Sequence, residues 1–275
     1  MSFSMEKDKQ NKRLIKKNIL SFFLSLSLIL LLIVLFLFNK NFNNSLIANF
    51  IFSIFFARFL IHISELYHEA IHFNFIPNNK ILNDKIANII LGIFIFKTDI
   101  SSARKMHFKH HSNKKDDYYT ENDLETYQFS PYQKFYNILL DFFGASIIRS
   151  VFSIRFNVKI KKIIFLILII SYYLMLGLLI HYNYYLVAAI VFSYGSIYMI
   201  FSRIRIFLQH SDKGSEKMHS KNLKKSFLNY LFTSEYMFLH KDHHEFPYID
   251  HIRLSEISDK ESHLNFFQSL NVFKN

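Results

Sequence analysis

Four long apolar stretches constrain this chain more than any other feature of its sequence. Residues 19–38 contain no charged residue and only three serines, and a helix of that length covers about 30 Å, one hydrocarbon thickness. Residues 45–63 form a second run, with Arg58 towards its far end, where a long basic side chain can reach the membrane surface. Residues 163–180 and 184–201 carry no charge, and the three residues between them predict a helical hairpin. The sequence therefore predicts four transmembrane helices.

The distribution of lysine and arginine predicts how these helices are oriented. Residues 1–18 hold 6 of these side chains, residues 64–162 hold 14, and residues 202–275 hold 11, whereas the short loops 39–44 and 181–183 hold 1 and 0. Because basic residues accumulate on the cytoplasmic side of membrane proteins, we expect a multi-pass protein with cytoplasmic N- and C-termini. The net charge of +12 then belongs mostly to the inner membrane face, and no motif supports binding of nucleic acid.

Two other apolar stretches are too short or too polar to span comfortably. The stretch 86–96 is only eleven residues long, and the stretch 135–152 is interrupted by Asp141 and Arg149. We therefore expect both to form helices in the membrane interface. The basic, asparagine-rich residues 1–18 are expected to form a short disordered cytoplasmic tail. Residues 19–275 are expected to form a single membrane domain.

The composition limits the chemistry available to the chain. Without cysteine there is no thiolate zinc site, iron–sulfur cluster or cysteine nucleophile, so any metal ion must bind to His, Asp or Glu. The five glycines never cluster before a helix, which argues against nucleotide-dependent chemistry. Fourteen histidines remain as candidate ligands.

Eight of these histidines form three compact motifs, HEAIH, HFKHH and HKDHH. Spacings of three and four residues place the imidazoles of one motif on nearly one face of a helix, where they can share a metal ion. With four spans, all three motifs lie on the cytoplasmic side. The members are His68 and His72; His107, His110 and His111; and His240, His243 and His244.

The number of ligands favours two metal ions over one. Eight imidazoles are too many for a single tetrahedral zinc, but they suit two ions of higher coordination number that keep open sites. Beside a bilayer this favours a pair of irons and oxygen chemistry on an apolar chain, whose unactivated C–H bond needs a strong oxidant. Taken alone, HEAIH also satisfies the zinc-protease pattern, with Glu69 as the general base.

The three motifs, in this order and joined to four spans, resemble the membrane fatty-acid desaturase superfamily, which also includes alkane hydroxylases and carotenoid ketolases. The resemblance covers roughly residues 45–254. It implies an all-α integral membrane fold of four transmembrane helices, interfacial helices and a cytoplasmic histidine-rich cap. In this family the cap holds a di-iron centre, so the resemblance makes the eight histidines of the motifs iron ligands. It adds His210, which lies where family members supply one more histidine after the fourth span.

The activity that the resemblance implies is an O2-dependent fatty-acyl desaturase, which introduces a C=C bond into the acyl chain of a lipid. A hydroxylase or ketolase using the same two iron ions is the nearest alternative, and an intramembrane zinc metalloprotease built on HEAIH is a distant one. No haem-binding His-Pro-Gly-Gly string is present, so we expect electrons to come from a separate ferredoxin or cytochrome.

Carboxylates beside the motifs are expected either to orient ligand imidazoles or to be solvated. They are Glu69 in the first motif, Asp116, Asp117, Glu121, Asp123 and Glu125 after the second, and Asp242 and Glu245 at the third. The remaining histidines, His62, His181, His219, His251 and His263, are expected to be structural.

Overall fold

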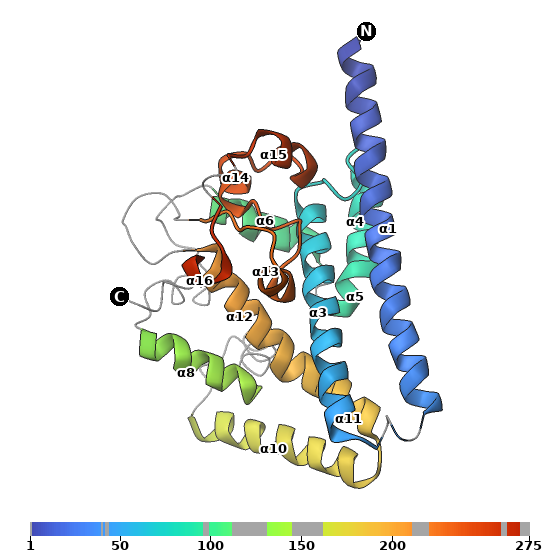
Figure 1. Cartoon of the computed structure of the whole chain (residues 1–275), viewed down its shortest axis with the longest axis vertical. Coiled ribbons are helices and arrows are strands. Elements are labelled where there is room, and N and C mark those ends of the chain that lie inside the picture. Colours follow the sequence, from blue (N-terminus) through green and yellow to red (C-terminus); the bar gives the residue numbers. More distant parts are fainter. Residues whose placement is uncertain are drawn as a thin grey trace. The chain divides into compact units, whose positions relative to one another are not determined.

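A computed structural model describes residues 2–39, 41, 44–95, 99–111, 131–144, 162–210, 220–259 and 263–269. These residues are helical or irregular, and only isolated β-bridges occur among them. The expected all-α class is therefore confirmed for this part of the chain. The helices labelled in Figure 1 include α1 (Ser2–Phe38), α3 (Leu46–Ile71), α6 (Ile100–His111), α8 (Pro131–Phe142), α10 (Lys162–His181), α12 (Tyr198–Gln209), α14 (His240–Glu245) and α15 (His251–Ile257).

Three helices among the described residues are long and apolar enough to cross a membrane. They are Asp8–Phe38 within α1, Leu46–Ile71 (α3), and Tyr185–Gln209, which joins α11 (Tyr185–Phe192), the π-helical turn η2 (Ser193–Ile197) and α12. The expected spans 19–38, 45–63 and 184–201 fall on these three helices. Large apolar side chains along α1, such as Leu24, Leu31 and Leu37, are exposed, which suits a lipid-facing surface.

The remaining apolar stretches form shorter elements. Within α10, residues Leu166–His181 form an apolar helix that is shorter than the three candidate spans, so a fourth crossing at 163–180 stays a prediction. Residues 86–95 of the stretch 86–96 fall in a run made of α4 (Lys80–Ile86), the π-helical turn η1 (Ala87–Leu91) and α5 (Gly92–Ile95), and residue 96 lies outside the described residues. The pair Lys80–Ile95 and Ile100–Phe108 is bent by 87°, as in a broken span or a re-entrant loop.

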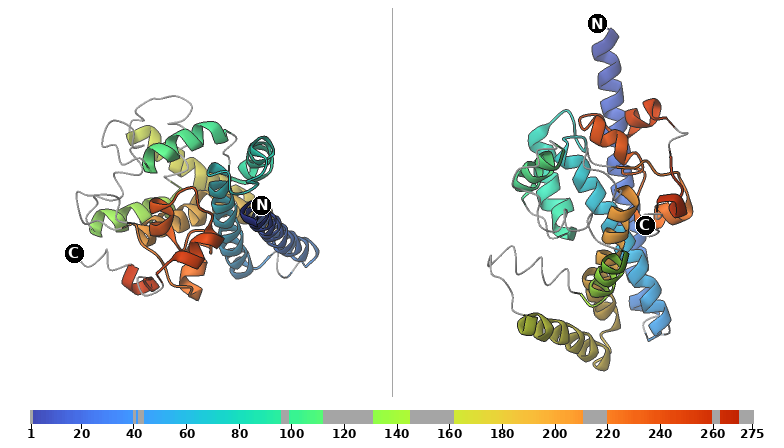
Figure 2. Two further views of the ribbon diagram at one scale, coloured as in Figure 1. Left: turned by 90° about the horizontal axis from the view of Figure 1, so that it is seen from above. Right: turned by 90° about the vertical axis from the view of Figure 1, so that its left-hand side faces the viewer.

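The expectation of a disordered start to the chain is wrong. Helix α1 begins at Ser2 and runs without a break into the apolar segment, as Figures 1 and 2 show. Two buried asparagines fix this part of the helix, because Asn11 Nδ2 donates to Asn78 Oδ1 (2.7 Å) and Asn18 Nδ2 donates to the carbonyl of Asn74 (3.0 Å). Once the apolar run is helical, adding turns to its end avoids the cost of a new nucleus.

The chain divides into two compact units. The first contains Met1–Ser25, Leu60–Pro131 and Arg205–Asn275, and the second contains Leu26–Phe59 and Tyr132–Ile204. In the first unit the core gathers around α3, where Leu60, Leu66 and Tyr67 are almost fully buried. The three histidine motifs and His210 all belong to this first unit.

The second unit contains a partly buried ion pair, which accounts for the presence of the charged Asp141 within an apolar stretch. The carboxylate of Asp141, on α8, is buried and accepts hydrogen bonds from Nε and Nη2 of Arg203, on α12. Both groups carry charge in a largely apolar helical unit, so each depends on the other. Residues 145–152 of the expected interfacial helix lie outside the described residues.

We expect Asp141→Ala to lower the free energy of unfolding by about 3 kcal/mol, because the partly buried guanidinium of Arg203 loses the carboxylate that accepts its hydrogen bonds. Thermal unfolding in detergent measures the effect. The matched control is Asp8→Ala, which removes the carboxylate of an exposed ion pair with Lys12 and is expected to leave the melting temperature unchanged. Equal effects of the two substitutions would contradict this prediction.

Candidate metal centre

Five histidines from all three motifs meet in the first unit. His68 lies on α3 and His72 directly follows it, His107 and His111 lie on α6, and His243 lies on α14. One ring nitrogen of each lies within 4.8 Å of the others, so the group can hold a metal ion. Figure 1 shows α6 and α14 close to the end of α3. Segments far apart in the sequence therefore form one histidine group, which we call group A.

Hydrogen bonds alone do not explain the centre of group A. The Nε2 atom of His107 lies 2.9 Å from Nε2 of His68, 2.8 Å from Nε2 of His72 and 2.9 Å from Nε2 of His111. An imidazole nitrogen has one in-plane site, which either donates one proton or offers one lone pair. Three such contacts at one nitrogen exceed that capacity. A cation shared by the four lone pairs removes the conflict.

Three further histidines form group B. Nε2 of His240 lies 2.9 Å from Nε2 of His210 and 3.0 Å from Nε2 of His244, and the three side chains can hold a metal ion. The two groups adjoin, because the rings of His111 and His244 have centroids 4.4 Å apart. The arrangement thus offers two neighbouring sites for metal ions.

The distances and the protonation of the donors fit metal binding. With metal–nitrogen bonds of about 2.1 Å, adjacent ligands of one ion lie about 3.0–3.4 Å apart, close to the separations in both groups. Burial lowers the pKa of His72 to about 3, with smaller contributions from His111 and Arg104, so this imidazole is neutral at pH 7 and its lone pair is free for a cation. The donor set is nitrogen only, which suits iron as well as zinc.

Eight of the nine histidines predicted as ligands are brought together in this way. They are His68, His72, His107, His111, His210, His240, His243 and His244. The backbone of His110 belongs to α6, but its side chain lies outside the described part of the structure. Ligation of iron by any of the nine stays a prediction.

The carboxylate between His68 and His72 has a partner that the sequence did not suggest. Glu69 is buried, and its Oε2 lies 3.5 Å from Nδ1 of His251, a residue expected to be structural. The predicted carboxylates that follow the second motif, Asp116, Asp117, Glu121, Asp123 and Glu125, lie outside the described residues.

The end of α3 has the geometry that places His72. Phe73 has a φ of 61°, its N–H donates to the carbonyl of Ala70, and the next N–H, from Asn74, donates to the carbonyl of Glu69. This is a Schellman motif with phenylalanine where glycine is usual. A left-handed phenylalanine is strained, so other contacts must hold this turn.

Arg104 supplies these contacts from α6, three residues before His107. Its Nε donates to the carbonyl of Ile71 (2.8 Å), and Nη2 donates to the carbonyl of Ala70 (3.2 Å). The guanidinium also pairs with Asp84 on α4 (2.6 and 3.0 Å) and lies 3.7 Å from the centre of the Phe73 ring. One side chain therefore joins the helix of the second motif to the end of the helix that carries the first.

A second network holds the helix end that carries His210. Gln209 Nε2 donates to Thr233 Oγ1 (3.3 Å), whose hydroxyl donates to Oε1 of the buried Glu65 on α3 (2.7 Å). Arg205, one turn before Gln209, lies 3.7 Å from the same carboxylate oxygen. His210 is thus fixed relative to α3.

Helix α14 is capped by a residue distant in the sequence. Oδ1 of the buried Asn222 accepts from the backbone N–H groups of Lys241 and Asp242, at 3.0 and 3.3 Å. These two hydrogen bonds satisfy backbone N–H groups in the first turn of α14, a six-residue helix that would not be stable alone. Sequence reasoning missed Arg104, Asn222 and Glu65, because a single arginine, asparagine or glutamate has no recognisable spacing.

Long apolar helices and a partly buried, histidine-lined site that could hold metal ions are features of a membrane protein with a candidate metal centre. The family model described as fatty acid desaturase matches residues 43–268, more than four fifths of the chain. The chain therefore belongs to the fatty acid desaturase family, and the resemblance found in the sequence is confirmed. No curated protein and no solved structure shows a significant match to the chain.

We expect His107→Ala to lower the metal content of the purified protein by at least half, because the substitution removes the nitrogen that contacts three others in group A. Elemental analysis per chain measures this loss. His181→Ala, at an exposed position outside both groups, is the control and retains the metal. Full metal content in the His107 variant would contradict the assignment of group A.

We expect Arg104→Ala to release metal to a chelator about tenfold faster, because the end of α3 and α6 lose their common partner. Arg104→Lys keeps a charge beside Asp84 but lacks the planar fork, so an intermediate rate is expected. Lys105→Ala, the exposed neighbour, is the control. A release rate unchanged in both Arg104 variants would show that the contact does not hold the site.

Proposed function

We propose that the chain is a membrane-bound, O2-dependent di-iron desaturase that introduces a C=C bond into the acyl chain of a lipid. The observation that carries the proposal is the convergence of seven motif histidines and His210 into two adjoining groups, within a chain of the fatty acid desaturase family. Membership of this family supports a lipid substrate and an oxidoreductase activity.

The nine predicted histidines would hold two iron ions, His110 being the ligand whose side chain the structure does not describe. Such a pair of irons supplies the oxidant that attacks an unactivated C–H bond. Over the whole reaction the acyl chain loses two hydrogens, and these, with two electrons and two protons from outside, reduce O2 to two water molecules. The chain itself contributes burial: His72, His240 and His243 are almost inaccessible, which limits the access of bulk water to their side of the centre.

We also propose that the topology is multi-pass, with four spans, cytoplasmic termini, a basic segment at residues 1–18 and a single domain at 19–275. Close contact of the first two motifs supports the interfacial or re-entrant path of the segment between them. The rings of His68 and His107 have centroids 4.5 Å apart, so the two ends of the segment that joins these motifs lie close together. Electrons would come from a separate ferredoxin or cytochrome.

A zinc protease is less well supported. Group A offers five imidazoles where such enzymes use three protein ligands, and Glu69, the base that a protease would need, is paired with His251. A hydroxylase or ketolase would use the same centre, and it differs in the product alone.

Expression in a host of defined lipid composition, followed by mass spectrometry of its lipids, tests the proposal. We expect acyl chains that have lost two hydrogens, and no such product from the His107→Ala variant expressed at the same level. Lipids that gain an oxygen atom would instead identify a hydroxylase. About one zinc per purified chain, without iron, would overturn the di-iron proposal.

A further inference from the structure

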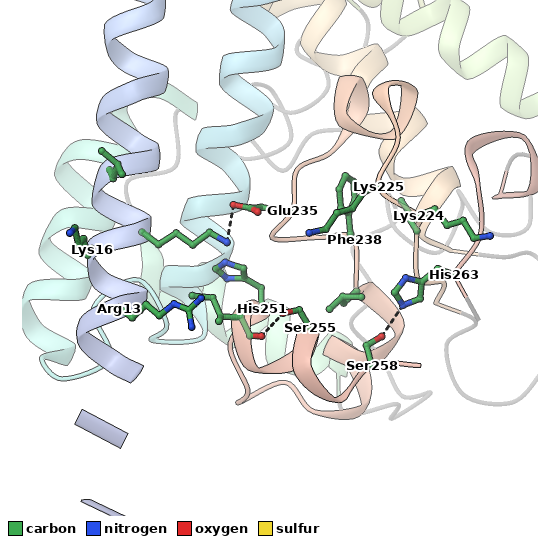
Figure 3. A pocket seen from close by; sticks show the side chains of 15 residues that line it. Arg13, Lys16, Lys224, Lys225, Glu235, Phe238, His251, Ser255, Ser258 and His263 are labelled. Atoms are coloured by element: carbon green, nitrogen blue, oxygen red, sulfur yellow. Dashed lines mark hydrogen bonds and ion pairs between the residues drawn. The ribbon is translucent and has the colours of Figure 1, made fainter. Parts of the chain in front are cut away.

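A large pocket in the first unit lies outside both histidine groups. It has a volume of about 920 Å³ and is formed by α1, by the segments around residues 223–225 and 235–239, and by α15 with the residues that follow it. Figure 3 shows Arg13 and Lys16 of α1 on one side of it and Lys224 and Lys225 on the other. None of the candidate iron ligands lines this pocket.

The rim of the pocket is strongly basic. Five lysine and arginine side chains line it, against one carboxylate, that of Glu235, which is already paired with Lys17 at 2.9 Å. The other four basic side chains are exposed, and none forms an ion pair with a described residue. They are Arg13, Lys16, Lys224 and Lys225. The pocket therefore has a surplus of positive charge that an anionic group can neutralise.

The pocket also has apolar walls. Leu223, Phe238 and Leu239 are buried beneath it, and Leu20 of α1 contributes an exposed apolar surface. A soluble phosphate ester would use the basic rim and leave these walls in water. An amphiphile with an anionic head and an apolar body uses both parts.

The position of the pocket along α1 indicates where such an amphiphile comes from. Lys16 and Lys17 are the last charged residues before the uncharged segment 19–38, and Leu20 is inside that segment. The rim thus lies beside the part of α1 where the polar layer of a bilayer is expected to meet the hydrocarbon. This is the depth of the phosphate groups of membrane lipids.

We propose that this pocket binds the phosphate headgroup of an anionic bilayer phospholipid. The lipid bridges α1 to the segment at residues 223–225 and to α15, elements that are distant in the sequence, and so stabilises the first unit. The proposal goes beyond the desaturase function and requires neither iron nor turnover.

The test compares the melting temperature of the full chain in nanodiscs of phosphatidylcholine with that in nanodiscs containing phosphatidylglycerol. We expect phosphatidylglycerol to raise the melting temperature of the wild type by about 3 °C, the scale on which a bound ligand shifts a chain of this size. The double variant Lys224→Gln, Lys225→Gln should lose this shift. The matched control, Lys9→Gln with Lys85→Gln, removes the same charge at exposed positions outside the pocket and should keep it.

Two results would overturn the proposal. One is a shift of the same size in the Lys224, Lys225 variant, which would place the lipid elsewhere. The other is an equal shift of the detergent-solubilised wild type with soluble glycerol phosphate, which would show that the ligand is a free phosphate ester. Native mass spectrometry checks the same variants for retained phosphatidylglycerol, and loss of retention in the pocket variant alone supports the site. A protein without iron or desaturase activity that still shows the lipid shift would contradict only the proposed function.

Discussion

Lone pairs of neutral imidazoles repel one another when they meet at one point, unless a cation lies between them. Around Nε2 of His107 three other ring nitrogens lie at 2.8–2.9 Å, and hydrogen bonds can account for only one of these contacts. Such an arrangement is stable only if its backbone supports are rigid or a metal ion is bound. Several side chains of the first unit provide this support, because they hold in place the helix ends that carry the histidines.

The supports act at helix ends, where backbone groups lack partners within the helix. Arg104 binds the last carbonyls of α3, Asn222 binds the first N–H groups of α14, and Gln209 ties the end of α12 to Thr233. Arg104 and Asn222 each satisfy free backbone groups at a helix end, and all three side chains help to fix the position of a histidine. The candidate spans Leu46–Ile71 and Tyr185–Gln209 thus serve two purposes, since their middle parts are apolar and candidate ligands lie at their ends.

The sequence anticipated the elements better than their grouping. Local spacing predicts that the imidazoles of one motif can share a metal ion, yet the third motif divides between the groups: His243 joins group A, while His240 and His244 join His210 in group B. A rotation of about 100° per residue explains the division, because His243 and His244 point to different flanks of α14. Which flank faces which group depends on how α14 packs, and local spacing contains no such information.

The sequence by itself determined the all-helical class, the four apolar stretches, of which three form helices long enough to span, the family, and the histidines that form the candidate centre. The helical class, the apolar stretches and the candidate ligands follow from composition and spacing, which act between residues close together in the chain. The family follows from the resemblance of the three histidine motifs to those of fatty acid desaturases. Only the tertiary structure decided that residues 2–18 continue α1 as helix, that Arg104, Asn222 and Glu65 support the histidines, and that basic residues from α1 and from 224–225 line one pocket. These features join residues separated by tens to hundreds of positions, and such contacts arise from packing, which no local pattern encodes.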